Sequence, residues 1–510
     1  MESDQNQEAS DTGGASANAA PQVDSGPSIA DTVSNRTKFY FGIGACGESA
    51  TNWMFNVLVF FYYQQILGLS AILAGLAISI SIVADAITDP LIGSISDRVQ
   101  SRYGRRHPFL FAAPIPLAIG IFLIFHPLEW FTQSQALLFT WFITTTIVTR
   151  TFYTFFAVPH LALGAELSPN YIERTKIMSF NALFNLYGGV FMHAVAMFVV
   201  FGYMYGSEGG QLYRPAYTPV VLVSCCVVIA SIFACAYGTR DQIERVKQFA
   251  PPQEPLSIWV LFSDIRRVLH NSNYRALLIG LFFLSMTIGT HETLGIYMVT
   301  FFWELSAYQY GFLMLNNIIG VHLGFFLSAR LHNKFDKRWT IVAGALGLSF
   351  FWSLAVNLGL LELTPDKSSW PLVWFIIFFG IFSSFFGAVL NISVMSALAD
   401  ISDEHELNTG MRQEGIFYAA RMFFSKAMNA MGHLIAGVAL EVYIKLPPQS
   451  VPGEVPADII FRLGVIDGPF AMIWGCIAAF IYMGYKLDRG SHAEIRRKLE
   501  LKRSAAGSPS

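Results

Sequence analysis

Twelve segments of the chain are each long and apolar enough to cross a lipid bilayer as an α-helix. The hydrocarbon core of a bilayer is about 30 Å thick and needs roughly 20 apolar residues in a helix. Lipid offers no hydrogen-bond partner to the backbone, so such segments span it as helices. We expect an all-α membrane protein with twelve transmembrane helices, at residues 39–67, 71–96, 108–126, 134–163, 176–203, 217–238, 274–304, 307–330, 338–359, 370–399, 413–443 and 464–486.

Lysine and arginine concentrate in every second connection between these segments. Only 13% of the residues are charged, against about 25% in soluble domains, so the position of each charge is informative. Basic loops stay on the cytoplasmic side, which predicts that these connections and both termini are cytoplasmic. No loop on the other side carries an N-glycosylation sequon, and this favours a bacterial inner membrane.

The longest connection separates six segments from six. Two six-helix halves are typical of secondary transporters, which bind their solute between the halves. The linker contains an apolar helical face that suits a helix lying on the membrane surface. The predicted parts are a disordered cytoplasmic tail (1–37), a first six-helix half (38–238), a cytoplasmic linker with an amphipathic helix (239–273), a second six-helix half (274–488) and a cytoplasmic tail (489–510).

Two carboxylates lie inside the second apolar segment. Asp85 and Asp89 are four residues apart and therefore share one helical face. A carboxylate at mid-membrane costs about 2.5–3.5 kcal/mol, so the pair needs a positive partner: a bound Na⁺, a shared proton or a lysine. Pro90 frees the carbonyl of Ala86 from its helical bond, and Thr88 adds a hydroxyl. The alternative to a cation site is an internal salt bridge that fixes helix packing.

Three stretches carry a resemblance to a known family. They are "DAITDPLIGSISDR" followed by "GRRHP", "AVPHLALGAELSPNYIERT" and "ADISDEHELNTGMRQEGIFYAARMFFSK". Together they resemble the glycoside-pentoside-hexuronide:cation symporters of the major facilitator superfamily, over about residues 38–488. The resemblance implies the major facilitator fold of two six-helix halves and alternating access driven by a cation gradient.

The same resemblance implies a site for the coupling cation. Asp85 and Asp89 match the two acids of the family's second helix, Thr154 matches a hydroxyl of the fourth helix, and Lys426 matches a lysine of the eleventh. Thr88 stands where asparagine occurs in the family, so the choice between Na⁺ and H⁺ stays open. Beyond this ion we expect no cofactor and no other metal.

The galactoside-binding side chains of the family do not carry over, and other polar groups replace them. Ser49, Asn52 and Trp53 form a polar-aromatic stripe on the first segment. Arg150 lies one turn before Thr154 and needs an anion, which is either a solute carboxylate or an acid of the protein itself. The predicted solute-binding residues are Ser49, Asn52, Trp53, Arg150, Asn181, His291, Glu292 and Asn391.

His291 and Glu292 lie near the middle of the seventh segment. A zinc-protease helix needs a second histidine at position 295, where this chain has Gly295. The pair is therefore read as a proton-handling or solute contact, with interhelical hydrogen bonding as the alternative.

The basic loop after the second segment resembles the cytoplasmic latch of the superfamily, in which charge pairs between helix ends close the inner side. The predicted gate residues are Asp97, Arg98, Arg105, Arg106, Glu166, Glu173, Arg412 and Glu414.

These observations predict a secondary active transporter rather than an enzyme, since the chain lacks a nucleotide-binding signature and a nucleophile–base pattern. The expected activity is Na⁺- or H⁺-coupled symport of a glycoside, a sugar acid or another organic anion. A lipid-like solute and a non-transporting sensor or scaffold are the alternatives. We expect a monomer whose partners are the solute, the cation and membrane lipid, with no nucleic acid.

Overall fold

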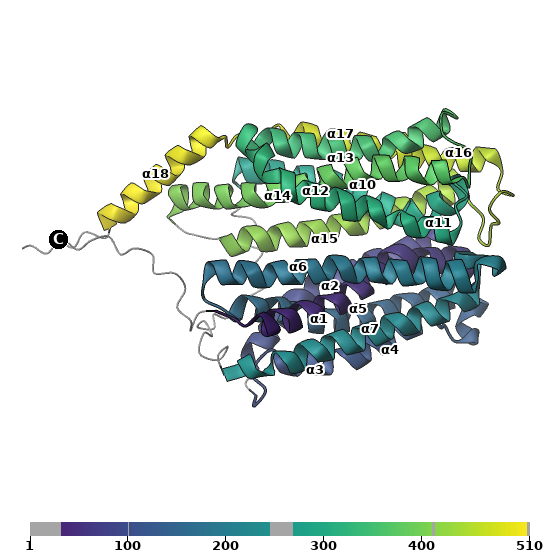
Figure 1. The fold of residues 1–510 in the computed structure, drawn as a ribbon, viewed down its shortest axis with the longest axis horizontal. Helices are drawn as coiled ribbons and strands as arrows, with labels where there is room; N and C mark the ends of the chain where they lie inside the picture. The colour runs from purple at the N-terminus through teal and green to yellow at the C-terminus, as the bar shows by residue number, and fades with distance from the viewer. Residues whose placement is uncertain (1–31, 100, 245–268, 411–413, 507–510) are drawn as a thin grey trace, which may run out of the picture.

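The computed structural model describes residues 32–99, 101–244, 269–410 and 414–506, and these form two groups of helices lying side by side. In Figure 1 the helices from α1 to α7 (purple to teal) occupy the lower group, and those from α10 to α17 (green to yellow) the upper one. No β-strand occurs in the part of the chain that the structure describes.

The first group is built from six helical runs, two of which end in a π-helical segment. Their bounds are α1 Asn35–Trp53 with η2 Met54–Val59 and η3 Tyr62–Ile66, α2 Ala71–Arg98, α3 His107–Ala112 with α4 Pro114–Phe125 and η4 Glu129–Gln133, α5 Gln135–Glu166, α6 Tyr171–Ala194 with η5 Val195–Met204, and α7 Tyr217–Gly238. The short 3₁₀ turns are η6 Gly206–Glu208, η7 Gly210–Leu212, η8 Arg214–Ala216 and η9 Arg240–Gln242.

The second group repeats this arrangement and adds a terminal helix. Its bounds are α10 Ser272–Tyr297 with η10 Met298–Phe302, α11 Ala307–Phe312 with α12 Met314–Lys334, α13 Lys337–Leu360, α14 Trp370–Thr409, α15 Glu414–Val438 with η11 Ala439–Ile444, α16 Ala457–Val465 with η12 Ile466–Phe470 and α17 Ala471–Tyr482, and finally α18 Arg489–Ala506.

Every one of the twelve predicted segments is helical in the residues that the structure describes. Ten of the helical runs are long and apolar enough to cross a membrane. The two segments outside that set, 39–67 and 134–163, are helical over 35–66 and 135–166. The predicted terminal tail 489–510 contains the helix α18. Most of the predicted linker, 245–268, lies outside the described residues.

The predicted first tail, 1–37, extends too far. Helix α1 begins at Asn35, because the Ser34 side chain accepts the backbone N–H of Thr37 as an N-cap. The backbone N–H of Val33 donates to Glu173 of α6 at 3.1 Å. Residues 32–37 therefore belong to the packed bundle, and residues 1–31 lie outside the described part.

Serine and asparagine caps start most of the long helices. The side chain of the preceding residue accepts a backbone N–H of the first turn in each of five helices, at Ser70, Ser134, Asn170, Asn271 and Ser369. This bond satisfies one of the amide groups that a helix leaves free at its start. The helix starts are thus set by local sequence.

The two groups meet where α15 packs against α2, and α15 also packs against α10 of its own group. Small residues line both contacts. A Cβ added to Gly75 of α2 would lie 2.9 Å from the carbonyl oxygen of His433, and one added to Gly432 of α15 would lie 2.7 Å from Cα of Gly289. Close backbone approach at small residues is a common mode of helix packing in membranes. It brings α2, which carries Asp85 and Asp89, against the second half.

The two ends of the bundle differ. The end with Arg105, Arg106, Lys337 and Arg489, here called the basic end, also carries α18 (Figure 1, left). At the opposite end the halves are hydrogen-bonded to one another. Tyr297 donates its hydroxyl to Gln64 at 2.9 Å, and the Gln65 amide donates to the carbonyl of Pro447 at 3.1 Å. Glu441 accepts the backbone N–H of Ile72 at 2.9 Å and so caps α2 from the other half.

Candidate functional site

Asp85 is buried and paired with Arg150 of α5. The guanidinium Nε donates to Oδ2 of Asp85 at 2.8 Å, and Nη2 donates to the same oxygen. The side chains are 2% and 14% exposed, and the guanidinium also lies 5.3 Å from the ring centre of Phe55. Arg150 therefore meets an acid of its own half, which was one of the two alternatives open from sequence.

Asp89, one turn further along α2, is held by two helices. Thr154 of α5 donates its hydroxyl to Oδ1 at 2.9 Å, and the ammonium group of Lys426 pairs with Oδ2. Lys426 belongs to α15, so this ion pair joins the two halves. The side chains of Asp89 and Lys426 are 27% and 28% exposed. Asp89 is thus more exposed than Asp85, whose side chain is 2% exposed.

The structure joins three of the five predicted cation-site residues, Asp89, Thr154 and Lys426, through their side chains. A fourth, Asp85, lies one turn away on α2 and pairs with Arg150 instead. The fifth, Thr88, points its hydroxyl to the backbone carbonyl of Asp85 at 3.4 Å rather than to a carboxylate. Both aspartates have a protein cation as partner in this conformation. The charge of the pair is therefore balanced by Arg150 and Lys426, and a coupling ion would compete with the lysine.

A short network beside this cluster involves Glu48 of α1, Asn52 and Tyr153. Tyr153 donates its hydroxyl to Glu48 at 3.1 Å, and the Asn52 amide donates to that hydroxyl oxygen at 2.9 Å. Asn52 is thus engaged within the first half. Its contact with Tyr153 could not be inferred from the sequence, since the two residues lie on different helices.

A cavity of about 980 Å³ lies between the halves, mostly against the second one. Four of the predicted solute-binding residues line it: Ser49, Trp53, His291 and Asn391. The other four, Asn52, Arg150, Asn181 and Glu292, are not among the residues that line this cavity.

Arg150 and Asn52 make the contacts described above, with Asp85 and Tyr153. Glu292 accepts a hydrogen bond from Asn429 of α15 at 3.3 Å, which is the interhelical alternative. The side-chain oxygen of Asn181 is buried without a hydrogen-bond partner among the described residues.

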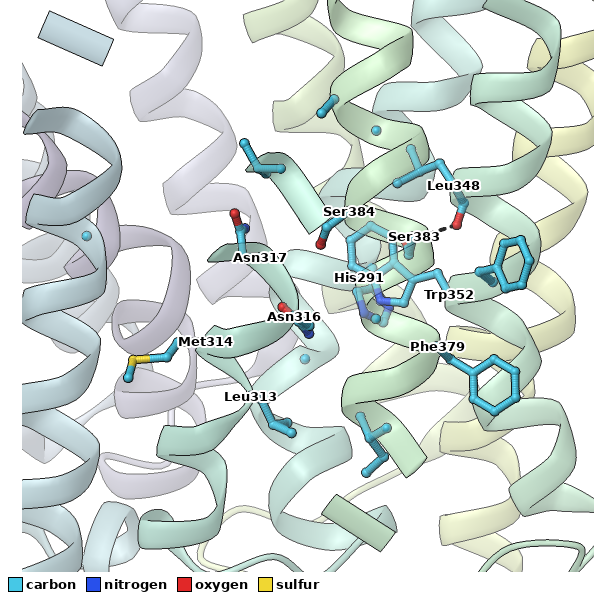
Figure 2. A pocket seen from close by; sticks show the side chains of 18 of the residues that line it. His291, Leu313, Met314, Asn316, Asn317, Leu348, Trp352, Phe379, Ser383 and Ser384 are labelled. Atoms are coloured by element: carbon cyan, nitrogen blue, oxygen red, sulfur yellow. Dashed lines mark hydrogen bonds between the residues drawn. The ribbon is translucent and has the colours of Figure 1, made fainter. Parts of the chain in front are cut away.

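His291 has a partner that sequence reasoning missed. Its Nδ1 lies 2.5 Å from Oδ1 of Asp467 in η12, and the edge of its ring contacts Trp352 of α13, with ring centres 3.6 Å apart (Figure 2). The signal for Asp467 was present, because an acid stands before Gly468 and Pro469 inside the last apolar segment. Asp89 likewise stands just before a proline, Pro90, inside an apolar segment.

Four of the predicted gate residues, Asp97, Arg105, Arg106 and Glu166, pair with one another at the basic end. Arg106 pairs with Asp97 and, at 2.6 Å, with Glu166, and its Nη1 donates to Ser96 at 2.6 Å. Arg105 pairs with Glu166 at 3.0 Å. These contacts fasten the loop after α2 to the end of α5, inside one half.

Glu173 was expected to meet those arginines and does not. It pairs instead with Lys38 of α1 and with Lys176 at 3.3 Å, because α6 packs along the start of α1. Arg98 ends α2. Arg412 and the side chain of Glu414 lie outside the described residues.

An equivalent charge cluster in the second half was not predicted. Lys337 pairs with Asp400 at 2.6 Å, and His492 of α18 lies 3.3 Å from Asp400 and 3.1 Å from Asp403. The terminal helix is thereby attached to α13 and α14.

Comparisons with known proteins identify the family of this chain. Residues 40–489 match the family described as MFS/sugar transport protein, where MFS is the major facilitator superfamily. The putative glycoside/cation symporter YagG of Escherichia coli K12 is 25% identical, over 92% of this chain and 96% of its own. The glucuronide carrier protein homolog of the same organism is 23% identical, over 84% and 90%. A solved structure of a bacterial homologue of the human drug peptide transporters PepT1 and PepT2 covers 91% of this chain and 99% of its own, with a TM-score of 0.60 at 13% identity. At this identity, the similarity to the peptide transporter homologue shows a common fold alone.

Proposed function

The chain belongs to the sugar-transport family of the major facilitator superfamily, among the glycoside-pentoside-hexuronide:cation symporters, and from this premise we propose that it imports a small organic solute together with a cation. The family consists of transporters and not of enzymes. The observation that carries the proposal is the ion pair between Asp89 and Lys426, because it joins the two halves at a partly exposed carboxylate.

The cation acts by replacing a protein charge. When Na⁺ or H⁺ neutralises Asp89, Lys426 loses its partner and the two halves lose an ionic link at mid-membrane. Thr154 and the carboxylate oxygens supply the hard oxygen ligands that Na⁺ prefers. Asp85 stays paired with Arg150 and keeps α2 against α5 during this exchange.

The proposed orientation places the basic end in the cytoplasm of a bacterial inner membrane, with twelve spans and both termini inside. The hydrogen bonds of Gln64, Gln65 and Glu441 between the halves then close the outer side. This corresponds to a state of alternating access that is closed to the outside.

For the solute, the cavity supports an organic molecule with polar groups and a ring. Trp53, Trp303 and Trp352 line it together with the amides of Asn316 and Asn317. Arg150, which the sequence suggested as a clamp for an anion, is held by Asp85. A glycoside suits these walls better than a sugar acid does.

The test uses purified protein in proteoliposomes with an imposed Na⁺ or pH gradient. Uptake of 4-nitrophenyl β-D-glucopyranoside should exceed its equilibrium level with one of the two gradients, and Asp89→Asn should abolish that excess. Matched vesicles with Asp458→Asn, the same change at an exposed acid of α16 that pairs with Arg462 of its own helix, serve as the control. Accumulation by Asp89→Asn at the wild-type level would refute the coupling role.

A further inference from the structure

We propose that His291 binds a hydroxyl group of the solute through its Nε2 atom, and that Asp467 is the residue that positions this imidazole. The inference rests on the proposed transport function and adds which residues of the second half select the solute. The subsite is the part of the cavity bounded by α10, α12, α13 and α14, shown in Figure 2.

The geometry of the two side chains points to this role. Nδ1 of His291 is engaged by Asp467 at 2.5 Å, so Nε2 is the ring nitrogen left for the cavity. The His291 side chain is 14% exposed and lines the cavity, whereas that of Asp467 is 0% exposed. A carboxylate bound to one ring nitrogen fixes the orientation of an imidazole and the hydrogen-bonding role of the other nitrogen.

Pairing with His291 accounts for the buried carboxylate of Asp467. Its second oxygen, Oδ2, is buried without a hydrogen-bond partner among the described residues. Burial of a carboxylate costs free energy unless the group is paired. Asp467 therefore depends on His291 as its partner. Trp352 contacts the ring from α13 and restricts its rotation. The imidazole is thus held from two sides, as expected for a group that must meet a ligand in one orientation.

The surrounding side chains indicate the chemical class of the ligand. Asn316, Asn317 and Ser384 also border this part of the cavity, and the aromatic rings of Trp352 and Phe379 form its apolar wall (Figure 2). Neither lysine nor arginine occurs among the described residues that line it. Amides and hydroxyls both donate and accept, as sugar hydroxyls do. A solute carboxylate would instead face Asp467, with no lysine or arginine of the lining to receive it.

A hydroxyl also suits His291 whatever its charge. Neutral imidazole with its proton on Nδ1 offers a lone pair at Nε2 to a solute O–H, and imidazolium offers an N–H to a solute oxygen. An uncharged, hydroxyl-rich group such as a pyranose is therefore the class that the subsite takes.

The experiment measures binding apart from transport. Quenching of tryptophan fluorescence in the purified full chain reports binding of 4-nitrophenyl β-D-glucopyranoside and of 4-nitrophenyl β-D-glucuronide, which differ in one carboxylate. Trp53, Trp303 and Trp352 at the cavity make the nitrophenyl quencher effective. We expect the glucoside to bind more tightly than the glucuronide.

The variants separate a positioning role from a structural one. His291→Ala should weaken glucoside binding about three- to tenfold, the effect of one lost hydrogen bond. His291→Gln should recover part of the lost glucoside affinity. Asp467→Asn should weaken binding to a smaller degree, and the double variant with His291→Ala should add nothing further. His433→Gln is the matched control, since His433 is a buried histidine bonded to Thr293 and does not line the cavity.

Unchanged glucoside affinity in His291→Ala, tighter binding of the glucuronide, or no binding of either compound by the wild type would each overturn the inference. Failure of the transport proposal looks different: the glucoside binds and responds to His291→Ala, but neither gradient drives its accumulation.

Discussion

Lys426 of α15 pairs with Asp89 of α2, and so a single ionic contact connects the second half of the molecule to a carboxylate of the first. Four residues earlier on the same helix, Asp85 pairs with Arg150 within the first half. The two acids share a helical face but differ in burial and in the half that supplies their cation. This difference leads to distinct expectations for the two sites.

Asp85→Asn should destabilise the protein more than Asp89→Asn. Removing one partner of a buried ion pair leaves an uncompensated charge and costs about 3–5 kcal/mol, and Arg150 would be left in this state. Asp89 and Lys426 are partly exposed, so water compensates for the loss there. Thermal unfolding in detergent measures the difference. Arg150→Gln combined with Asp85→Asn should recover stability; equal melting temperatures of the two single variants would contradict the assignment.

Lys426→Gln should tighten the binding of the coupling cation while it impairs coupled uptake. The lysine occupies the carboxylate that the ion is proposed to bind, so its removal frees Asp89. Titration of Na⁺ or H⁺ against thermal stability or tryptophan fluorescence reports the affinity. Lys445→Gln, at an exposed loop position, is the control. A weaker cation response in Lys426→Gln would mean that the lysine assists ion binding rather than competing with it.

Gly432→Ala should lower stability, whereas Gly295→Ala should leave it nearly unchanged. A Cβ at position 432 would lie 2.7 Å from Cα of Gly289 in α10, so the two helices would have to separate. A Cβ at position 295 meets nothing within 4 Å. Overpacking of this kind costs about 1–3 kcal/mol. The melting temperatures of the two variants in the same detergent provide the comparison, and similar values would exclude a tight α10–α15 contact.

Glu173→Gln should loosen the start of the first helix. Glu173 binds the backbone N–H of Val33 and pairs with the buried Lys38, so its loss leaves a buried ammonium without a partner, at a cost of about 1–3 kcal/mol. Hydrogen–deuterium exchange at residues 32–38 should rise. Lys176→Gln removes only an exposed partner of the same acid and is expected to change exchange little. Unaltered exchange in Glu173→Gln would show that this segment is held by other contacts.

Much of the fold was predictable, for reasons that are local. Apolar length sets each span, and the caps at Ser70, Ser134 and Asn170 start helices where the sequence places them. The start of α1 was predicted slightly late because the attachment of Val33 to Glu173 joins residues 140 positions apart. The prediction that Glu173 pairs with the latch arginines was wrong for the same reason. Helix α6 packs along α1, and the closeness of Glu173 to the loop in the sequence did not indicate this contact.

The sequence by itself determined that this chain crosses a membrane as helices, and that Asp85 and Asp89 share one face, because apolar length and helical period depend on neighbouring residues alone. Only the tertiary structure decided which charged side chains pair with one another. Arg150 lies 65 residues from Asp85, Lys426 lies 337 from Asp89, and Asp467 lies 176 from His291. In lipid every buried charge needs a partner, yet the choice of partner follows from how distant helices pack.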